Sequence, residues 1–213
     1  MENNLIEKKG KTIRKHSFLE HGFTLFTEKN IESVTLQDVA DASGHGVATL
    51  YRYFNTKAGF VVAVAEYKWK EFFKWNRTRR PDNYDDMSAY ELYEYYLDSY
   101  IALYKNNKDL LRFNQYFNIY ARSEEFESSV LDLYHELLNP IINHFHIMYE
   151  RAKIDRTIKT DISEHEMLTL TLHLMLAVIT RYAVGLAYEP EGSYNDLEEL
   201  EIQKQMLLTR YKN

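Results

Sequence analysis

The stretch from Thr35 to Lys57, TLQDVADASGHGVATLYRYFNTK, decides the fold of this chain. Thr35 and Asp38 have the spacing of a capping box, so they predict the start of a helix. Ser43-Gly44 predicts its end, because glycine adopts the left-handed conformation that a C-cap needs. A second short helix follows, with apolar residues at helical spacing. Two short helices joined by a glycine turn form a helix-turn-helix, whose second helix fits the major groove of DNA.

Composition favours a helical protein. The chain has 213 residues, of which 45% are hydrophobic, so it can bury a core in one or two domains. Seven glycines and three prolines are too few for the many turns of a β-sandwich. The absence of cysteine excludes a disulfide framework and a zinc finger.

No targeting or membrane segment is expected. The N-terminal residues lack the apolar core of a signal peptide. The longest apolar region, 168–188, contains His173 and Arg181, which argues against a membrane span. We therefore expect a cytoplasmic protein without a membrane partner.

The net charge of −6 is unevenly distributed. Residues 1–80 contain 14 basic and 9 acidic residues, a balance of +5, and the remainder carries −11. A basic front and an acidic back are expected when only one end of a protein meets phosphate. Chance can produce such a split on solvated surfaces, but its coincidence with the helix-turn-helix favours nucleic-acid binding.

The spacing of apolar residues and helix breakers predicts an all-α protein of about nine helices. A three-helix, helix-turn-helix domain would span residues 1–55, and a helical domain would span residues 56–213. Asn30 should stop the first helix, Thr56 should cap the fourth, and Pro140 should kink or split a later one. Besides the two short helices, those expected cover residues 12–29, 56–79, 88–104, 109–122, 124–152, 163–188 and 194–211.

The N-terminal part resembles the DNA-binding domain of the tetracycline-repressor (TetR) family of bacterial regulators. The resemblance covers about residues 12–65, and its elements recur in order at the right distances. They are Leu25-Phe26, Thr35, the turn at 39–44, the run at 49–54 and Lys57. The resemblance implies a homodimer that represses transcription at a palindromic DNA operator and leaves it when a small molecule binds the C-terminal domain.

The resemblance also assigns DNA contacts. Contacts to phosphate, which position a protein without reading sequence, are expected from Thr35, Tyr51, Tyr53 and Lys57. The candidates for base edges are Gln37, Val47, Ala48 and Thr49, with His45 and Gly46 beside them. Relatives usually have valine, serine and two polar or basic residues at 45–48, so this helix tip is unusually apolar. Tyr51 could instead be half core, and Tyr53 a covering aromatic residue.

No pattern of catalytic residues stands out. Gly44-His45-Gly46 is not a phosphate loop, because it follows a helix and lacks the third glycine. Lone histidines on apolar helices are more often structural than metal ligands. We expect neither an enzyme nor a cofactor or metal site.

The apolar pattern of residues 163–188 predicts the oligomeric state of the protein. Its apolar residues cover nearly the whole circumference of a helix, which then needs burial on all sides. With the helix at 194–211, it would form the interface of an obligate homodimer. The alternative is a central core helix in a monomer.

Besides DNA and a second copy of the chain, we expect a third partner, an apolar or aromatic small-molecule effector. The aromatic residues and two histidines that could line its pocket are Tyr96, Tyr100, Phe113, Tyr116, Phe117, Tyr120, His144 and His173. They could equally be ordinary core residues. The rival function is a helical interaction module, or a small-molecule or metal carrier, that uses the helix-turn-helix as a scaffold.

Overall fold

The computed structural model describes residues 2–123, 136, 139–185 and 195–213. In these ranges the regular elements are nine α-helices and one short 3-10 helix, and the only strand-like feature is a bridge between Ile158 and Lys212. The all-α class is confirmed. None of the described helices is both long enough and apolar enough to cross a membrane.

The helices belong to two compact units. One comprises Met1–Glu71 and Arg112–Leu137, and the other Phe72–Leu111 and Leu138–Asn213. The divisions fall inside α4 (Lys57–Arg77) and α6 (Lys108–Ser123), so both helices contribute to both units.

The first unit is built on α1 (Glu2–Lys29), which contacts α2 (Leu36–Ser43) and α3 (Val47–Phe54). Its core contains packed aromatic rings: the Phe60 ring lies 5.8 Å from that of Phe26, tilted, and 4.9 Å from that of Phe54, edge to face. Such rings bury large apolar areas, and edge-to-face arrangements are among those they prefer. Through Phe60, this core holds the end of α3 and the start of α4 against α1.

The start of α1 was predicted ten residues too late. The helix begins at Glu2 rather than at residue 12, because Gly10 is the only breaker before that point and a single glycine weakens a helix without ending it. Its predicted stop is confirmed, since Asn30 is left-handed at φ 69°. Thr56 caps α4 as expected, and its hydroxyl accepts a hydrogen bond from the Gly59 amide at 3.0 Å.

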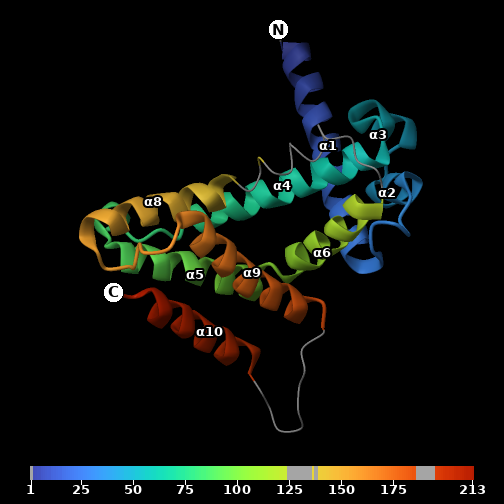
Figure 1. Ribbon diagram of the computed structural model, residues 1–213. Coiled ribbons are helices and arrows are strands. Elements are labelled where there is room, and N and C mark those ends of the chain that lie inside the picture. Colours follow the sequence, from blue (N-terminus) through green and yellow to red (C-terminus); the bar gives the residue numbers. More distant parts are fainter. Residues whose placement is uncertain (1, 124–135, 137–138, 186–194) are drawn as a thin grey trace. The chain divides into compact units, whose positions relative to one another are not determined.

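The second unit is organised around α5 (Ala89–Asn106), after the 3-10 helix η1 (Tyr84–Asp86). It contacts α8 (Asn139–Asp155), α9 (Glu164–Ala183) and α10 (Asp196–Tyr211) (Figure 1). The buried Lys204 of α10 lies 2.6 Å from Asp98 and 3.2 Å from Glu94, both on α5. Removing a carboxylate would leave a buried charge, so these ion pairs fix the register of the two helices.

One expectation about the later helices needs correction, and one lies outside the described residues. Pro140 is the second described residue of α8, and the turn before it, where a kink or split was expected, falls on residues 137–138, which are not described. The rest of the expected 124–138 segment lies outside the described residues, apart from residue 136. The helix expected at 163–188 ends at Ala183, and Gly185 is left-handed at φ 78°. Residues 186–194 lie outside the described ranges.

Candidate nucleic-acid interface

The start of α2 is fixed by the predicted capping box. The Thr35 amide donates to Asp38 Oδ2 at 2.7 Å, and the Asp38 amide donates to Thr35 Oγ1 at 3.1 Å. The hydrogen bonds from the Thr35 hydroxyl and amide lower the pKa of Asp38. The side chain of Thr35 is exposed but already engaged in this cap.

The turn between the helices depends on Gly44. Its φ is 70°, a conformation that glycine adopts without strain. The amides of Gly44 and His45 donate to Asp41 O at 3.2 Å and Ala40 O at 3.1 Å, which satisfies the last carbonyls of α2. Gly46 then begins α3 with no side-chain cap, as its sequence predicted.

The short helix α3 has one buried face and one exposed face. Leu50 and Phe54 are buried in the unit, whereas Ala48, Tyr51 and Arg52 are exposed. Tyr51 is 50% exposed, so it is half core and still leaves half of its surface accessible to a partner. The exposed face therefore presents a methyl group, a phenol and a guanidinium to any partner.

Several predicted contact residues have intramolecular partners. Gln37 Nε2 donates to Asp41 Oδ1 at 2.7 Å, and the half-buried His45 ring packs edge-on against Phe18 at 5.5 Å. Tyr53 also packs against Phe18, at 6.2 Å. Of the other candidates for base contacts, Val47 and Thr49 are half-buried, and Gly46 is exposed.

Lys57 is held at the edge of the same unit. Its Nζ donates to Glu32 O at 3.1 Å and lies 5.5 Å from the centre of the Tyr120 ring. A phosphate contact from Lys57 would therefore exchange or share these partners.

Sequence reasoning missed Arg52. This exposed cation lies one helical turn after Ala48, and its guanidinium is 6.0 Å from the Tyr53 ring. The spacing of four residues on α3 was the available signal, because residues four apart share a helix face. Among the exposed residues of α3, it is the cation that can meet phosphate.

A polar network joins α1 to α4 within the first unit. Tyr67 Oη lies 2.5 Å from Glu20 Oε1 and 2.7 Å from both Glu71 Oε1 and His16 Nε2. Burial, followed by these two carboxylates, raises the pKa of Tyr67. Burial opposes ionisation of Glu20, but hydrogen bonds from Lys68 and Tyr67 outweigh it and lower the pKa of Glu20.

Two groups of described residues bring three metal-ligating atoms within 4.8 Å of one another. They are His16, Glu20 and Glu71, and His146, Glu150 and Glu164. In each group a lysine already pairs with a carboxylate: Lys68 with Glu20 and Glu71, and Lys153 with Glu150. These pairs favour a structural role, and the absence of a metal site stays an expectation.

The predicted effector residues belong to different units. In the first unit, the Phe113 ring packs against Phe23 and Phe117, at 5.6 and 6.1 Å. In the second unit, the buried Tyr100 hydroxyl donates to that of Tyr96 at 2.8 Å. Of the remaining four, Tyr120 is buried, Tyr116 and His144 are half-buried, and His173 is exposed on α9.

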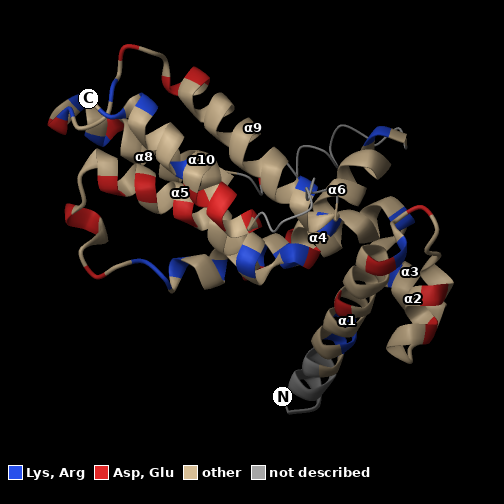
Figure 2. Ribbon diagram, turned by 90° about the horizontal axis from the view of Figure 1, so that it is seen from below, with Lys and Arg blue, Asp and Glu red and all other residues tan. Residues whose placement is uncertain are grey.

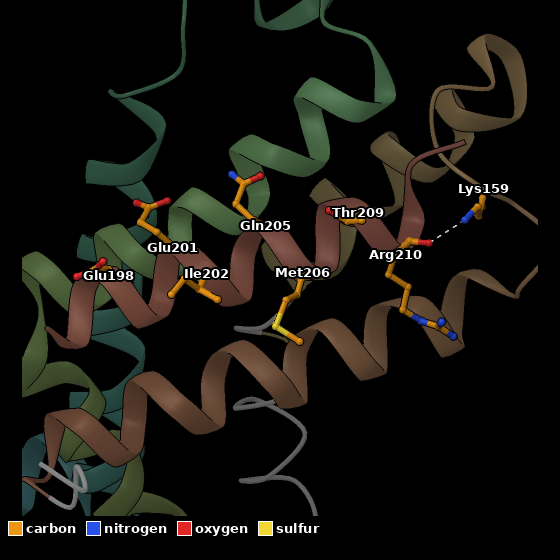
Figure 3. A pocket seen from close by; sticks show the side chains of 8 residues that line it. All are labelled: Lys159, Glu198, Glu201, Ile202, Gln205, Met206, Thr209 and Arg210. Carbon is orange, nitrogen blue, oxygen red and sulfur yellow. Dashed lines mark hydrogen bonds between the residues drawn. The ribbon is translucent and has the colours of Figure 1, made fainter. Parts of the chain in front are cut away.

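The second unit exposes apolar side chains on the helices expected to form a dimer. Leu170 and Leu174 of α9 are 38% and 45% exposed. On α10, Ile202 and Met206 are 47% and 66% exposed and line a groove with polar neighbours (Figure 3). Leu200 and Leu207 of the same helix, which was expected to complete the interface, are instead buried within the unit.

Comparisons with known proteins match this geometry. A family model described as "Bacterial regulatory proteins, tetR family" matches residues 18–64, which include all of α2 and α3. A search of curated proteins finds no match.

Solved structures share the fold over most of the chain. The fatty acid degradation regulator FadR from Bacillus halodurans is 14% identical, with a TM-score of 0.71 over 92% of this chain and 94% of that one. FadR from Bacillus subtilis in complex with stearoyl-CoA is 12% identical, with a TM-score of 0.72 over 91% and 97%. A tetR-family regulatory protein from Rhodococcus RHA1 is 12% identical, with a TM-score of 0.70 over 92% and 95%. At these identities the likeness shows the fold.

Proposed function

Because residues 18–64 make the chain a member of the tetR family of bacterial regulatory proteins, we propose that it represses transcription by binding DNA through α3. Residues 1–55, together with Lys57 just after them, bind a palindromic operator, and the rest of residues 56–213 dimerise and bind a small molecule that releases the DNA. The protein acts by binding, without catalysis. The observation that carries the proposal is the capped helix-turn-helix with an exposed α3 face at Ala48, Tyr51 and Arg52.

In the proposed interface, different residues contact the phosphates and the bases. Tyr51, Arg52 and Lys57 are suited to phosphate oxygens, because hydroxyl and cationic groups position a protein on the duplex. The tip of α3 offers only the apolar side chains of Val47 and Ala48, so it cannot make the bidentate arginine–guanine contact. Contact with thymine methyl groups is the readout that these side chains allow.

Dimerisation through α9 and α10 is supported by their exposed apolar residues. Leu170 and Leu174 lie one helical turn apart, as do Ile202 and Met206. A two-fold interface uses the same patch on both subunits, and burying such a patch removes apolar surface from water. Two recognition helices related by this symmetry should read an inverted repeat.

Release by an effector is supported by the second unit's buried aromatic residues. The Tyr96 ring packs at 5.3 Å from both Tyr100 and Phe145. A Bacillus subtilis protein with this fold was solved with stearoyl-CoA, so the fold can accommodate a ligand with an acyl chain. An effector releases DNA only if it prefers the arrangement that does not bind DNA.

A gel shift on the DNA upstream of the chain's own gene tests the proposal, with footprinting to locate the site. The expected result is a protected inverted repeat at nanomolar protein. A chain that binds no DNA better than a random duplex at matched salt would instead support the scaffold reading.

A further inference from the structure

Arg80, just after α4, is a partly buried cation that lacks a carboxylate partner among the described residues. A guanidinium has five N–H donors. One of them, on Nη2, meets His144 Nε2, while the buried Nε has no acceptor in the described part of the chain. The guanidinium carbon lies 4.4 Å from the centre of the Tyr84 ring. A buried donor without an acceptor is unfavourable, so this guanidinium is short of acceptors.

The ring of His144, which meets Arg80 through Nε2, carries one further donor. A guanidinium can only donate, so Nε2 of His144 must be the acceptor and the ring hydrogen must lie on Nδ1. Burial, followed by the charges of Arg80 and Arg77, lowers the pKa of His144. The ring is therefore neutral at pH 7, and it leaves the charge of Arg80 uncompensated.

The chain around Arg80 carries charges of both signs, since residues 77–86 contain three arginines and three aspartates. In Figure 2 the segment that leaves α4 is coloured for Lys and Arg before the acidic turn of η1 begins. Arg79 stacks on Trp75 at 4.7 Å, and Arg151 donates to Met87 O at 2.5 Å and to Asp85 O at 3.0 Å. The carboxylates of the loop at 82–86 are exposed, and none of them forms an ion pair with Arg80.

We propose that Arg80 and His144 bind the anionic group, a carboxylate or a phosphate, of a small molecule whose apolar part packs on Tyr84 and Tyr95. These two rings lie 5.5 Å apart, edge to face, next to the guanidinium. A carboxylate or phosphate would supply the acceptors that Arg80 lacks, and paired charged hydrogen bonds to arginine are strong. If this molecule is the effector that releases DNA, that role rests on the proposed function, whereas the anion-binding site itself does not.

Calorimetry without DNA tests the site directly. The probes are octanoate and octyl phosphate, and octanamide is their uncharged counterpart. The wild-type protein should bind at least one of the anions more than tenfold more tightly than octanamide. The better anion identifies the group as carboxylate or phosphate. If neither anion binds more tightly than octanamide, the proposal is wrong, whatever the variants do.

Two variants with the same change in charge locate the site. Arg80→Gln should remove the preference for the anion, whereas Arg79→Gln should keep it within about twofold. A preference that survives in a folded Arg80→Gln protein would overturn the assignment, and circular dichroism checks the fold. Should Arg80→Gln not fold, Arg80→Lys keeps the charge but loses the planar fork, and an unchanged affinity would likewise contradict the site.

Adding the better anion to the gel shift separates this site from the proposed function. Anion binding without release of DNA would leave the site standing and refute regulation through it. DNA binding without anion binding would refute the anion site and leave the proposed DNA-binding function standing.

Discussion

Two apolar side chains, Val47 and Ala48, occupy the first turn of α3, the proposed recognition helix, where many DNA-binding proteins carry polar groups. Ala48 is exposed and Val47 is half-buried. Burying one methyl group stabilises a complex by about 0.8 kcal/mol, which is roughly fourfold in affinity.

Replacing half-site thymines one at a time by deoxyuridine removes only their methyl groups. We expect at least one position to weaken binding by about fourfold, or more than tenfold when both half-sites are changed. Competition binding at constant salt measures the effect. Equal affinity for every substituted operator would exclude apolar readout and leave Gln37, His45 or DNA shape as the source of specificity.

His144 gives a pH dependence of known sign. Its pKa is lowered in the folded protein from the ordinary value of 6.5, so the unfolded chain binds this proton more readily. The neutral His144 ring therefore makes its full contribution to the unfolding free energy above pH 6.5, and this contribution is lost as the pH falls below 6.5 towards the lowered pKa. For one group the slope is at most about 1.4 kcal/mol per pH unit.

Urea unfolding between pH 8 and 5.5 should therefore show a smaller decrease in stability for His144→Gln than for the wild type. The exposed His173 of α9 provides the control, and His173→Gln should follow the wild type. Parallel pH profiles for all three proteins would contradict the account of His144.

The sequence predicted local features of the site better than its contacts. The Thr35–Asp38 cap and the Gly44 turn depend on neighbours in sequence, so both were predicted and are confirmed. The packing of His45 on Phe18 depends on tertiary structure, which no local pattern reports. Arg80 and His144 are 64 residues apart in sequence, and only the fold brings them together.

At the scale of elements, helix boundaries set by local caps were predicted well. The helices expected from residues 88 and 163 do begin there, and the side chains of Ser88 and Ser163 cap α5 and α9, because capping depends on neighbours in sequence. The end of α9 was missed because apolar spacing continues past Ala183, whereas Gly185 takes a left-handed conformation. The face that α10 buries depends on its packing against α5 and α9, which periodicity alone does not specify.

Gly22 lies where α1 approaches α4 closely. A Cβ at this position in α1 would lie 2.4 Å from Cζ of Phe60, whose ring is fully buried and packed against Phe26 and Phe54. Overpacking of this kind costs about 1–3 kcal/mol, more than the roughly 1 kcal/mol that alanine gains over glycine in a helix.

Gly22→Ala should therefore lower the unfolding free energy. Gly10→Ala is the matched control in the same helix, where a Cβ meets nothing within 4 Å. Gly10→Ala should be neutral or stabilise by up to about 1 kcal/mol. Thermal unfolding of the two variants decides, and a Gly22→Ala protein as stable as Gly10→Ala would show that α1 and α4 can move apart.

At the scale of the whole molecule, the proposed dimer depends on a small exposed patch. A chain of 25.4 kDa should sediment at twice that mass. Leu174→Glu and Met206→Glu place a charge in the patch and should shift the protein towards monomer, because burying an unpaired charge is costly. Ile154→Glu on α8, where the side chain is 80% exposed, is the control and should not change the mass. Dimers of unchanged stability in both patch variants would place the interface elsewhere.

The central claim is that the exposed face of α3 binds DNA, and Ala48→Glu tests it most directly. Glutamate in the first turn suits the helix N-terminus, so the fold should persist, while its carboxylate would face the phosphates of the groove. Thr160→Glu, at an exposed loop position, carries the same added charge and serves as the control. Fluorescence anisotropy with the footprinted operator at constant salt should show at least a tenfold loss of affinity for Ala48→Glu and nearly unchanged affinity for Thr160→Glu. If a folded Ala48→Glu protein binds as tightly as the wild type, α3 does not enter the groove and the account is wrong.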